Sequence, residues 1–242
     1  MELEEFERYK RQLPIWGKDG QKKISTARIA IIGLGGLGCT SAYYLTAAGI
    51  GKLGLIDYQK VQLSDLSRQI LFDTESIGKL KVRIAAERLK KLNPEVIIKP
   101  INRTIKKSNI DILKDYNIIL DGTDNYETRF LLNDYCFKKD KIFIFAAADT
   151  LQGIVSVFRR GTPCLRCIVP KVYRPGCRAI LGTIPAILGL IQALEALKII
   201  TNGSSSLEGY MLIFNGTTLT FDRIKIKKDR ECVCKKFNKV QA

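Results

Sequence analysis

The segment from Ile29 to Gly38 constrains the fold of this chain more than any other. An apolar run is followed by glycines at Gly33, Gly35, Gly36 and Gly38. This pattern predicts a buried parallel strand, a tight turn and the N-terminus of a helix. Such a turn presents backbone N–H groups and the positive end of a helix dipole, which attract phosphate. The segment therefore predicts an α/β fold with a nucleotide-binding turn.

Strand and helix patterns alternate along the first part of the chain. The predicted strands are Arg28–Gly33, Leu53–Asp57, Val96–Ile101, Asn117–Asp121 and Lys141–Ala148, and the predicted helices are Leu37–Ala48, Lys79–Leu92 and Asn125–Lys138. This order predicts a Rossmann-like, doubly wound, mostly parallel sheet with helices on both faces. In the C-terminal half, Gly153–Arg159 and a hairpin across Asn215-Gly216 predict antiparallel strands that extend the sheet.

Two further helices are expected. Glu2–Leu13 has helical character and is predicted to end at Pro14. The stretch Ala179–Leu194 is uncharged but shorter than the roughly 20 apolar residues that span a bilayer. We therefore expect a buried helix, no membrane association, and a soluble cytoplasmic protein, since the charged N-terminus does not match a signal peptide.

The composition excludes several kinds of chemistry. The 242 residues include 40 Lys and Arg, 24 Asp and Glu, and no His, which gives a net charge of +16. Without histidine there is no Ser–His–Asp triad and no His-ligated zinc. The positive charge favours an acidic partner, or it reflects solvated lysines; no aromatic-interleaved basic array predicts nucleic-acid binding. A reaction that needs only positioning and charge stabilisation, such as nucleotidyl transfer, fits best.

Charged residues follow two of the predicted strands. Asp57 ends the second strand, where a carboxylate accepts hydrogen bonds from ribose. Arg68 and Lys81 come soon after it, and a cation early in a helix predicts a nearby anion; Lys79 is a competing candidate. Asp124 follows the fourth strand, where it either holds Mg²⁺ on the phosphates or caps the next helix. These charges favour a triphosphate over a dinucleotide.

An NAD-dependent oxidoreductase is the alternative interpretation of the glycine turn. A GxGxxG turn with an acidic residue about 20 positions later most often indicates a dinucleotide. A hydride-transferring enzyme, however, usually carries a positioned proton donor, and the chain contains no Tyr-x-x-x-Lys motif. Bound nicotinamide or dehydrogenase activity would support this alternative.

Four of the seven cysteines form two tight pairs, Cys164-x-x-Cys167 and Cys232-x-Cys234. Two pairs in a chain without histidine predict a Cys₄ structural zinc site in a reducing compartment, stapling the C-terminal tail to the loop after Gly161. The second pair has a tighter spacing than is usual for zinc ligands. The alternatives to a complete Cys₄ site are that one ligand is displaced or that the site is empty. Cys177 lies between Arg174 and Arg178, which favour a thiolate; otherwise it is an ordinary loop cysteine.

The chain resembles the ubiquitin-activating-enzyme-like superfamily, and within it the MoeB/ThiF/HesA adenylyltransferases. The resemblance runs nearly end to end and rests on motifs in the family's order. These are RYKRQ from Arg8, GLGGLG from Gly33, SDLSRQ from Ser64, IGKLK from Ile77, DGTDN from Asp121, CLRC from Cys164 and the apolar helix around ILGLIQALEALK.

The resemblance implies an activity and its participants. Family members use Mg-ATP to adenylate the C-terminal Gly-Gly carboxylate of a small β-grasp sulfur carrier, of the ThiS or MoaD type, and release pyrophosphate. The resemblance also implies a homodimer and a structural Zn²⁺. A separate sulfur donor is expected because no C-terminal rhodanese domain is recognised. We expect one adenylating domain over residues 1–242, with a nucleotide-binding part at about 1–150 and a carrier-binding and zinc part at about 151–242.

The resemblance also implies roles for single residues. Arg68 and Lys81 would stabilise charge at the α-phosphorus, Arg11 would reach the γ-phosphate of the other subunit's ATP, and Cys177 would receive an acyl group or sulfur. The implied nucleotide-binding residues are Gly33, Gly35, Gly36, Gly38, Asp57, Ser64, Asp65, Leu66, Ser67, Arg68, Lys81, Asp124 and Asn125, and the implied zinc ligands are Cys164, Cys167, Cys232 and Cys234.

Asp65 departs from the family pattern, which has Asn at this position. An additional negative charge beside the triphosphate either weakens binding or recruits metal. A non-catalytic carrier-binding scaffold, damaged at Asp65, is therefore a second alternative. A relative of tRNA-modifying dehydratases is a third; it shares the ATP site, but the paired cysteines argue against it.

Overall fold

The computed structural model describes residues 7–169, 179–229, 232 and 234. The helices are α2 (Leu13–Thr26), α3 (Gly36–Ala47), α4 (Lys81–Leu92), α5 (Tyr126–Lys138), α6 (Leu165–Ile168) and α7 (Thr183–Asn202). The strands are β1 (Arg28–Ile32), β2 (Lys52–Ile56), β3 (Ile97–Ile101), β4 (Ile118–Asp121), β5 (Ile142–Asp149), β6 (Gln152–Phe158), β7 (Tyr210–Asn215) and β8 (Thr220–Lys225). The short 3₁₀ helices η1 (Leu63–Asp65), η2 (Thr74–Ser76) and η3 (Ile110–Leu113) lie in the connections.

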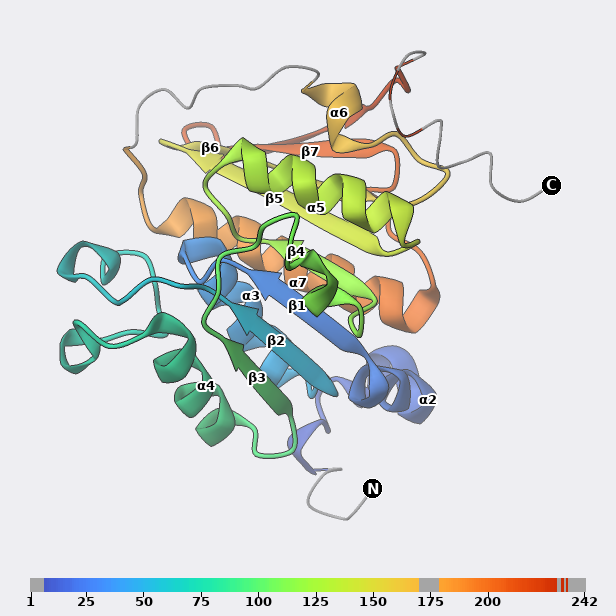
Figure 1. The fold of residues 1–242 in the computed structure, drawn as a ribbon. Helices are drawn as coiled ribbons and strands as arrows, with labels where there is room; N and C mark the ends of the chain where they lie inside the picture. The colour runs from blue at the N-terminus through green and yellow to red at the C-terminus, as the bar shows by residue number, and fades with distance from the viewer. Residues whose placement is uncertain (1–6, 170–178, 230–231, 233, 235–242) are drawn as a thin grey trace.

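All strands form one sheet in the order β3-β2-β1-β4-β5-β6-β7-β8 (Figure 1). The first five strands in this order pair in parallel, and β5 to β8 pair in antiparallel fashion. Because β1, β2 and β4 are parallel, their carboxyl ends lie at one edge of the sheet. The strand order reverses direction at β1, and ligands of such sheets usually bind at this point of that edge. The predicted fold class is confirmed, including the antiparallel extension in the C-terminal half.

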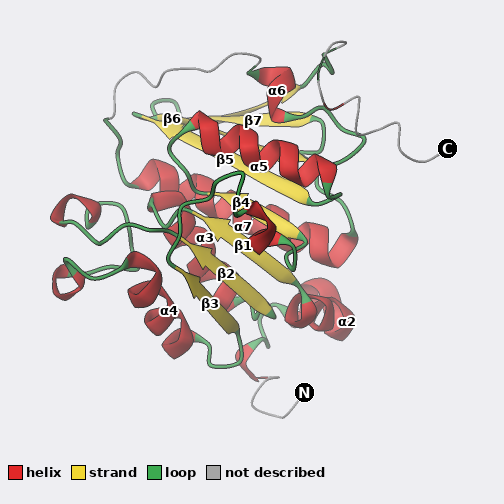
Figure 2. Ribbon diagram, in the orientation of Figure 1, coloured by secondary structure: helices red, strands yellow, loops and turns green. Residues whose placement is uncertain are grey.

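Helices cover both faces of the sheet (Figure 2). One core contains apolar side chains of α2, α3, α4 and α7, with Ile29 and Ile31 pointing to it from β1. A second core on the opposite face contains Ala30 and Ile32 of β1, the apolar side of α5 and several phenylalanine side chains of β5 and β6. Residues of β1 alternate between the two cores because successive strand side chains point to opposite faces.

Helix α7 is the central helix of the first core. By length and composition alone it is apolar enough to cross a membrane, but 56% of its most apolar window is buried inside the protein. Gly189 allows close packing on α3, because a Cβ at this position would lie 2.6 Å from the Leu37 carbonyl oxygen. The Gln192 side chain donates to the carbonyl oxygens of Asp121 and Ile144 at 2.9 and 3.0 Å. The helix is therefore a core helix whose buried polar group is hydrogen-bonded, as the sequence predicted.

Two local predictions are wrong. Residues 2–6 of the predicted helix Glu2–Leu13 lie outside the described residues. Pro14 does not end a helix at Leu13; residues 9–12 form turns, and Pro14 lies in the first turn of α2. Proline suits this position because the first helical N–H groups need no partner inside the helix. The β7–β8 hairpin exists, but residues 216–219 connect its strands, and Leu219 has a φ of 57°. The turn is therefore longer than the Asn215-Gly216 pair predicted.

Candidate functional site

The glycine turn joins β1 to α3 at the carboxyl edge of the sheet. Gly33 has a φ of 91°, a left-handed conformation that favours glycine. A Cβ at Gly33 would also lie 2.5 Å from the carbonyl oxygen of Gly122, in the loop after β4. No described side chain caps the N-terminus of α3. Its first backbone N–H groups are therefore a suitable site for an anion.

Asp57 follows β2 beside this turn, as predicted. Its Oδ2 accepts a hydrogen bond from the backbone N–H of Leu34 at 2.7 Å, and its Oδ1 accepts one from Gln59 at 2.8 Å. These bonds fix the carboxylate against the glycine turn. Each carboxylate oxygen can accept a second hydrogen bond, so the group retains the capacity to bind ribose hydroxyls.

Asp65 is the centre of a buried polar cluster. Its Oδ2 lies 3.1 Å from Lys81 Nζ, and its Oδ1 lies 3.2 Å from Arg68 Nη2. Gln69 Nε2 donates to Oδ1 at 2.7 Å. The backbone N–H of Gln62 donates to Oδ2 at 3.0 Å. The residue that departs from the family pattern thus joins the two cations predicted to bind phosphate.

Lys81 is the first residue of α4, and only 4% of its side chain is exposed. A buried cation at a helix N-terminus needs a negative partner. The protein supplies one in Asp65, and Lys81 Nζ also donates to Gln59 Oε1 at 3.0 Å. Lys79 is exposed. Of the two candidate lysines, Lys81 is therefore the one that belongs to the cluster.

Arg68 is the more accessible cation of the cluster, with 30% of its side chain exposed. Its Nη1 donates to the Ser64 carbonyl oxygen at 2.7 Å. A Cβ added to Gly36 would lie 3.1 Å from the Arg68 carbonyl oxygen, so the cluster borders the glycine turn. Ser64 and Ser67 are exposed and Leu66 is half-buried.

Asp124 follows β4 on the other side of the turn and is exposed. The N-cap of α5 is Asn125, whose Oδ1 accepts from the Thr128 backbone N–H at 2.9 Å. The alternative in which Asp124 caps this helix is therefore wrong. Its carboxylate has only a long contact, 3.5 Å from Asn125 Nδ2, among the hydrogen bonds found for the described residues. Its oxygens are accessible to a metal ion.

Arg129 and Asp121 form a buried ion pair that the sequence analysis missed. Arg129 Nε donates to Asp121 Oδ2 at 3.1 Å, and its Nη2 donates to the Thr123 carbonyl oxygen at 2.6 Å. The guanidinium also lies over the rings of Tyr126 and Phe145. Burial raises the pKa of Asp121, although Arg129 and Thr123 lower it in part. The pair anchors the loop that carries Asp124; its sequence signal was an Asp at a strand end with an Arg on the next helix.

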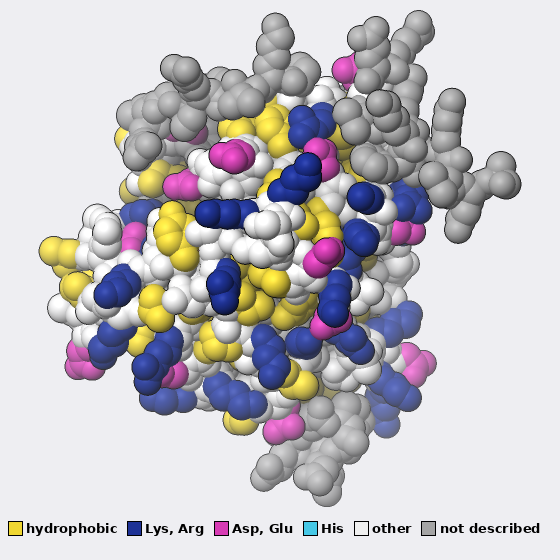
Figure 3. Space-filling model, in the orientation of Figure 1, with side chains coloured by type: hydrophobic (Ala, Val, Ile, Leu, Met, Phe, Trp, Pro, Cys, Tyr) yellow, Lys and Arg dark blue, Asp and Glu magenta, His cyan; other side chains and the backbone are white. Residues whose placement is uncertain are grey.

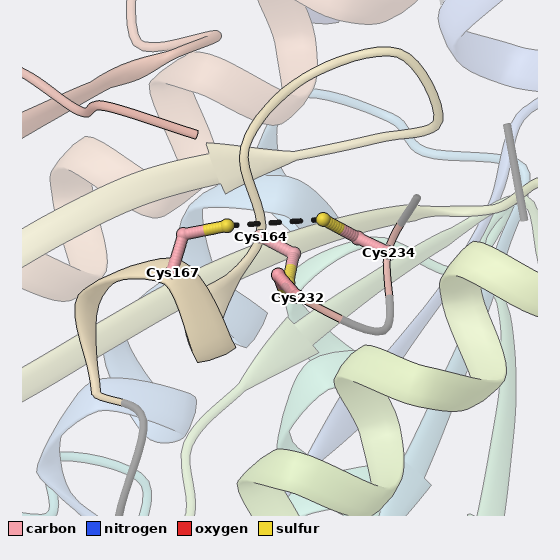
Figure 4. A group of neighbouring side chains, drawn as sticks. All are labelled: Cys164, Cys167, Cys232 and Cys234. Atoms are coloured by element: carbon pink, nitrogen blue, oxygen red, sulfur yellow. Dashed lines mark hydrogen bonds between the residues drawn. The ribbon is translucent and has the colours of Figure 1, made fainter. Parts of the chain in front are cut away.

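The four predicted zinc ligands converge (Figure 4). Cys164 and Cys167 lie at α6, and Cys232 and Cys234 come from the C-terminal segment. Their sulfur atoms all lie within 4.8 Å of one another, with separations of 3.4 Å for Cys164–Cys232 and 3.7 Å for Cys167–Cys234. Sulfurs about 2.3 Å from a tetrahedral zinc ion are about 3.8 Å apart. The Cys₄ group therefore fits Zn²⁺, and the C-x-C spacing does not displace a ligand.

The environment of this cluster is consistent with a structural site. Burial raises the pKa of Cys164 and raises that of Cys234 to about 12. Burial opposes ionisation of Cys167, yet hydrogen bonds from neighbouring groups leave its pKa lowered. Leu165 N–H donates to Asn133 Oδ1 at 3.0 Å, which ties α6 to α5. A metal ion here would join the C-terminal segment to the second core.

Arg11, predicted to reach the ATP of another subunit, lies away from the nucleotide site of its own chain. Arg11 is exposed, and the neighbouring Gln12 donates to the Ala48 carbonyl oxygen at the C-terminal end of α3. The glycine turn lies at the opposite end of this 12-residue helix, about 18 Å away at 1.5 Å per residue. Cys177 lies outside the described residues.

Lys and Arg side chains are distributed over the face of the protein shown in Figure 3. On the face shown, Lys and Arg are interspersed with Asp and Glu and with apolar side chains, and they form no continuous basic stripe. This distribution agrees with the sequence, in which no aromatic-interleaved basic array was found.

Comparison with known proteins identifies relatives along nearly the whole chain. The model of the ThiF family matches residues 9–235. A sulfur carrier protein adenylyltransferase of Thermus thermophilus is 35% identical over 96% of this chain and 91% of its own length. The adenylyltransferase and sulfurtransferase MOCS3 of Mus musculus is 38% identical over 95% of this chain, which spans 52% of that protein. The chain thus corresponds to about half of the MOCS3 relatives.

Solved structures support the fold. Escherichia coli MccB with ATP has a TM-score of 0.82 at 21% identity, over 94% of this chain and 74% of that chain. PaaA has a TM-score of 0.81 at 21% identity, over 94% of this chain and 84% of that chain. At this level of identity the likeness concerns the arrangement of helices and strands alone.

Proposed function

The chain belongs to the ThiF family, and from this premise we propose that it is an ATP-dependent adenylyltransferase of a small ubiquitin-like sulfur carrier. The substrate is the C-terminal Gly-Gly carboxylate of a ThiS- or MoaD-type protein. The products are the carrier acyl-adenylate and pyrophosphate. The adenylyltransferase names of the relatives support the reaction class.

The proposal rests above all on one arrangement at the carboxyl edge of the sheet. The glycine turn, the Asp57 carboxylate, the Arg68 and Lys81 cations and the exposed Asp124 lie after neighbouring strands or in the connection between them. A nucleoside triphosphate needs a ribose acceptor, phosphate-binding N–H groups, cations and a metal-binding carboxylate, and this edge of the sheet offers all four.

The reaction needs no general base. An oxygen of the carrier carboxylate attacks the α-phosphorus, a new O–P bond forms, and the bond from the α-phosphorus to the bridging oxygen breaks as pyrophosphate leaves. The carboxylate is already ionised at neutral pH, which suits a chain without histidine. The protein contributes alignment and positive charge. Lys81 and Arg68 hold the phosphates and stabilise the charge that develops on them.

Asp124 is the residue proposed to hold Mg²⁺, with Asn125 beside it. Bound Mg²⁺ neutralises and orients phosphate oxygens. The fit rests on the accessibility of the Asp124 carboxylate and on the buried Asp121–Arg129 pair, which fixes the backbone of the loop next to it.

The remaining parts of the proposal concern assembly. Residues 1–150 would bind the nucleotide, and residues 151–242 would bind the carrier and a structural Zn²⁺ at the cysteine cluster. As the family resemblance implies, Arg11 would complete the site of a second subunit in a homodimer; it is exposed and lies far from the site of its own chain. Cys177 would accept the acyl group or sulfur, and a separate protein in the same reducing, cytoplasmic compartment would donate the sulfur.

Adenylate formation tests the proposal directly. The purified chain is incubated with ATP, Mg²⁺ and, in turn, each β-grasp protein of the same genome that ends in Gly-Gly. Intact-mass spectrometry should show that one of these proteins, the true carrier, gains the mass of one AMP. That carrier would also identify thiamine thiazole or molybdopterin biosynthesis as the pathway.

Two controls make the result specific. A carrier that lacks its terminal glycine should gain no AMP, and the Lys81→Gln variant should lose most of the product. If the chain binds ATP but no carrier is modified, the alternative of a carrier-binding scaffold replaces the proposal.

A further inference from the structure

Asp65 lies between two cations that the proposed reaction assigns to phosphate. Its two oxygens are divided between them, one toward Lys81 and one toward Arg68. The residue is buried, with 5% of its surface exposed, and Lys81 is buried as well, with 3% exposed. The Lys81–Asp65 pair is therefore not a surface ion pair of small effect, because little water reaches it, whereas Arg68 keeps 30% of its side chain exposed.

The cluster needs this carboxylate when no nucleotide is bound. A buried ammonium group without a negative partner is costly. The other near neighbour of Lys81 Nζ is neutral, the Oε1 atom of Gln59 at 3.0 Å. The position of Lys81 in the first turn of α4 adds an unfavourable helix dipole. Asp65 is therefore the only full negative charge among the hydrogen bonds and ion pairs found for the Lys81 ammonium in the described part of the chain.

We propose that Asp65 is an internal counter-ion that holds Lys81 and Arg68 in the nucleotide-free enzyme and competes with the triphosphate for them. The proposal rests on the proposed function, since it assumes that these cations bind phosphate. It makes Asp65 a positioning residue that limits nucleotide affinity and eases the release of pyrophosphate.

The competition follows from charge. When phosphate oxygens approach the same two cations, the Asp65 carboxylate repels them and still shares the positive groups. Gln69 and the Gln62 backbone N–H also bind the carboxylate and keep it in place. The triphosphate therefore cannot displace Asp65 and must bind a partly neutralised site. Removal of the carboxylate charge should strengthen phosphate binding.

Calorimetric titration of ATP into the purified wild-type chain and the Asp65→Asn variant tests this directly. We expect the Kd of Mg-ATP to fall about tenfold in the variant, the size expected from one charge at short range in a partly buried site. The nucleotide-free variant should unfold at a lower temperature than the wild type, and saturating ATP should raise its Tm by more.

The same titration in EDTA separates a counter-ion from a metal ligand. A counter-ion repels metal-free ATP too, so Asp65→Asn should strengthen binding with and without Mg²⁺. Weaker binding only in the presence of Mg²⁺ would make Asp65 a metal ligand and overturn the proposal. Unchanged or weaker binding in both conditions would overturn it as well.

Glu87→Gln is the matched control. It removes one carboxylate from α4, where Glu87 pairs with Arg83 on the surface with 55% of its side chain exposed. The net charge changes by the same amount, but the Kd of ATP should stay within about twofold of the wild-type value, because exposed pairs are screened.

A second variant keeps the test informative if Asp65→Asn does not fold. The Asp65→Asn/Lys81→Gln double variant removes both the carboxylate and its buried cation, and we expect it to recover stability relative to Asp65→Asn. Independent, additive losses would contradict the counter-ion. Failure of the wild-type chain to bind ATP would contradict the proposed function and this inference together, whereas unaltered affinity of the variant contradicts this inference alone.

Discussion

Two carboxylate–cation groups flank the glycine turn. They differ in how far contacts within the protein occupy the arginine side chain. On one side, Arg129 is bound by Asp121 and the Thr123 carbonyl and packs on Tyr126 and Phe145. On the other side, Arg68 keeps 30% of its side chain exposed. The comparison indicates that the first group supports the backbone, while the second retains cationic capacity for a ligand.

Removal of Arg129 should have the largest effect. In Arg129→Gln, Asp121 would remain buried without its cation, and we expect the free energy of unfolding to fall by about 3–5 kcal/mol. Urea denaturation measures this loss. Arg83→Gln, which breaks an exposed ion pair on α4, should change it by less than about 0.5 kcal/mol.

The pH dependence sharpens this prediction. Burial already raises the pKa of Asp121 above its ordinary value, so its protonated form favours the folded state. The stability that protonated Asp121 contributes is therefore present at acid pH, and it is lost as pH rises through the pKa of Asp121 in the folded protein. Without Arg129 that pKa should rise further. The stability difference between Arg129→Gln and wild type should thus be smaller near pH 4 than at pH 7; a difference independent of pH would contradict the ion pair.

Lys81→Gln should lose much activity and little stability, whereas Arg129→Gln should lose much stability. We expect carrier-dependent ATP–pyrophosphate exchange to fall about 10²–10³-fold, the usual effect of losing one group that stabilises transition-state charge. Stability should fall less than in Arg129→Gln, because Arg68 and Gln69 still bind Asp65. Lys79→Gln, at an exposed lysine, is the matched control. Equal effects of both substitutions on exchange would break the comparison.

Metal binding at the cysteine cluster should raise the stability of the chain without changing the contacts of Arg129 or Asp65. We expect Zn²⁺ at about 100 times its Kd to stabilise the chain by about 2.7 kcal/mol, and chelation to remove this gain. Cys234→Ser should abolish the response to Zn²⁺, whereas Cys39→Ser, at a buried cysteine of α3 outside the cluster, should retain it. A metal response that survives Cys234→Ser would contradict the assigned ligand set.

The helix cap beside Asp124 should give the smallest effect. Asn125→Ala removes the hydrogen bond to the Thr128 backbone N–H and should lower the free energy of unfolding by about 1 kcal/mol. Asn125→Asp, which keeps a capping oxygen, should be close to wild type. Denaturation curves of the two variants test the assignment of the cap to Asn125 and not to Asp124.

The sequence predicted the parts of the site that depend on strand ends. In a parallel sheet the residues after β1, β2 and β4 meet at one edge whatever the details of packing, so Gly33, Asp57 and Asp124 could be placed from periodicity and glycines alone. The cysteine pairs could be recognised because ligand spacing within each pair is a local property, and a chain without histidine left each pair as the partner of the other.

The ion pairs could not be predicted in this way. Lys81 was expected to need an anion, but the identity of that anion depends on how η1 packs beside the N-terminus of α4. The signal for Arg129, an Asp at a strand end followed by an Arg on the next helix, is weak, since one arginine on a charged helix is usually solvated. Its burial depends on the rings and carbonyl groups of β5 and the Asp121 loop. Tertiary packing decides both.

ATP–pyrophosphate exchange tests the central claim, that this site adenylates a carrier protein, most directly. The purified chain is mixed with ATP, Mg²⁺, labelled pyrophosphate and each Gly-Gly-ended β-grasp protein of the same genome. We expect labelled ATP to form only with one carrier and with Mg²⁺, and the label to be lost in Lys81→Gln. Absence of exchange with every carrier, in a chain that binds ATP, would contradict it.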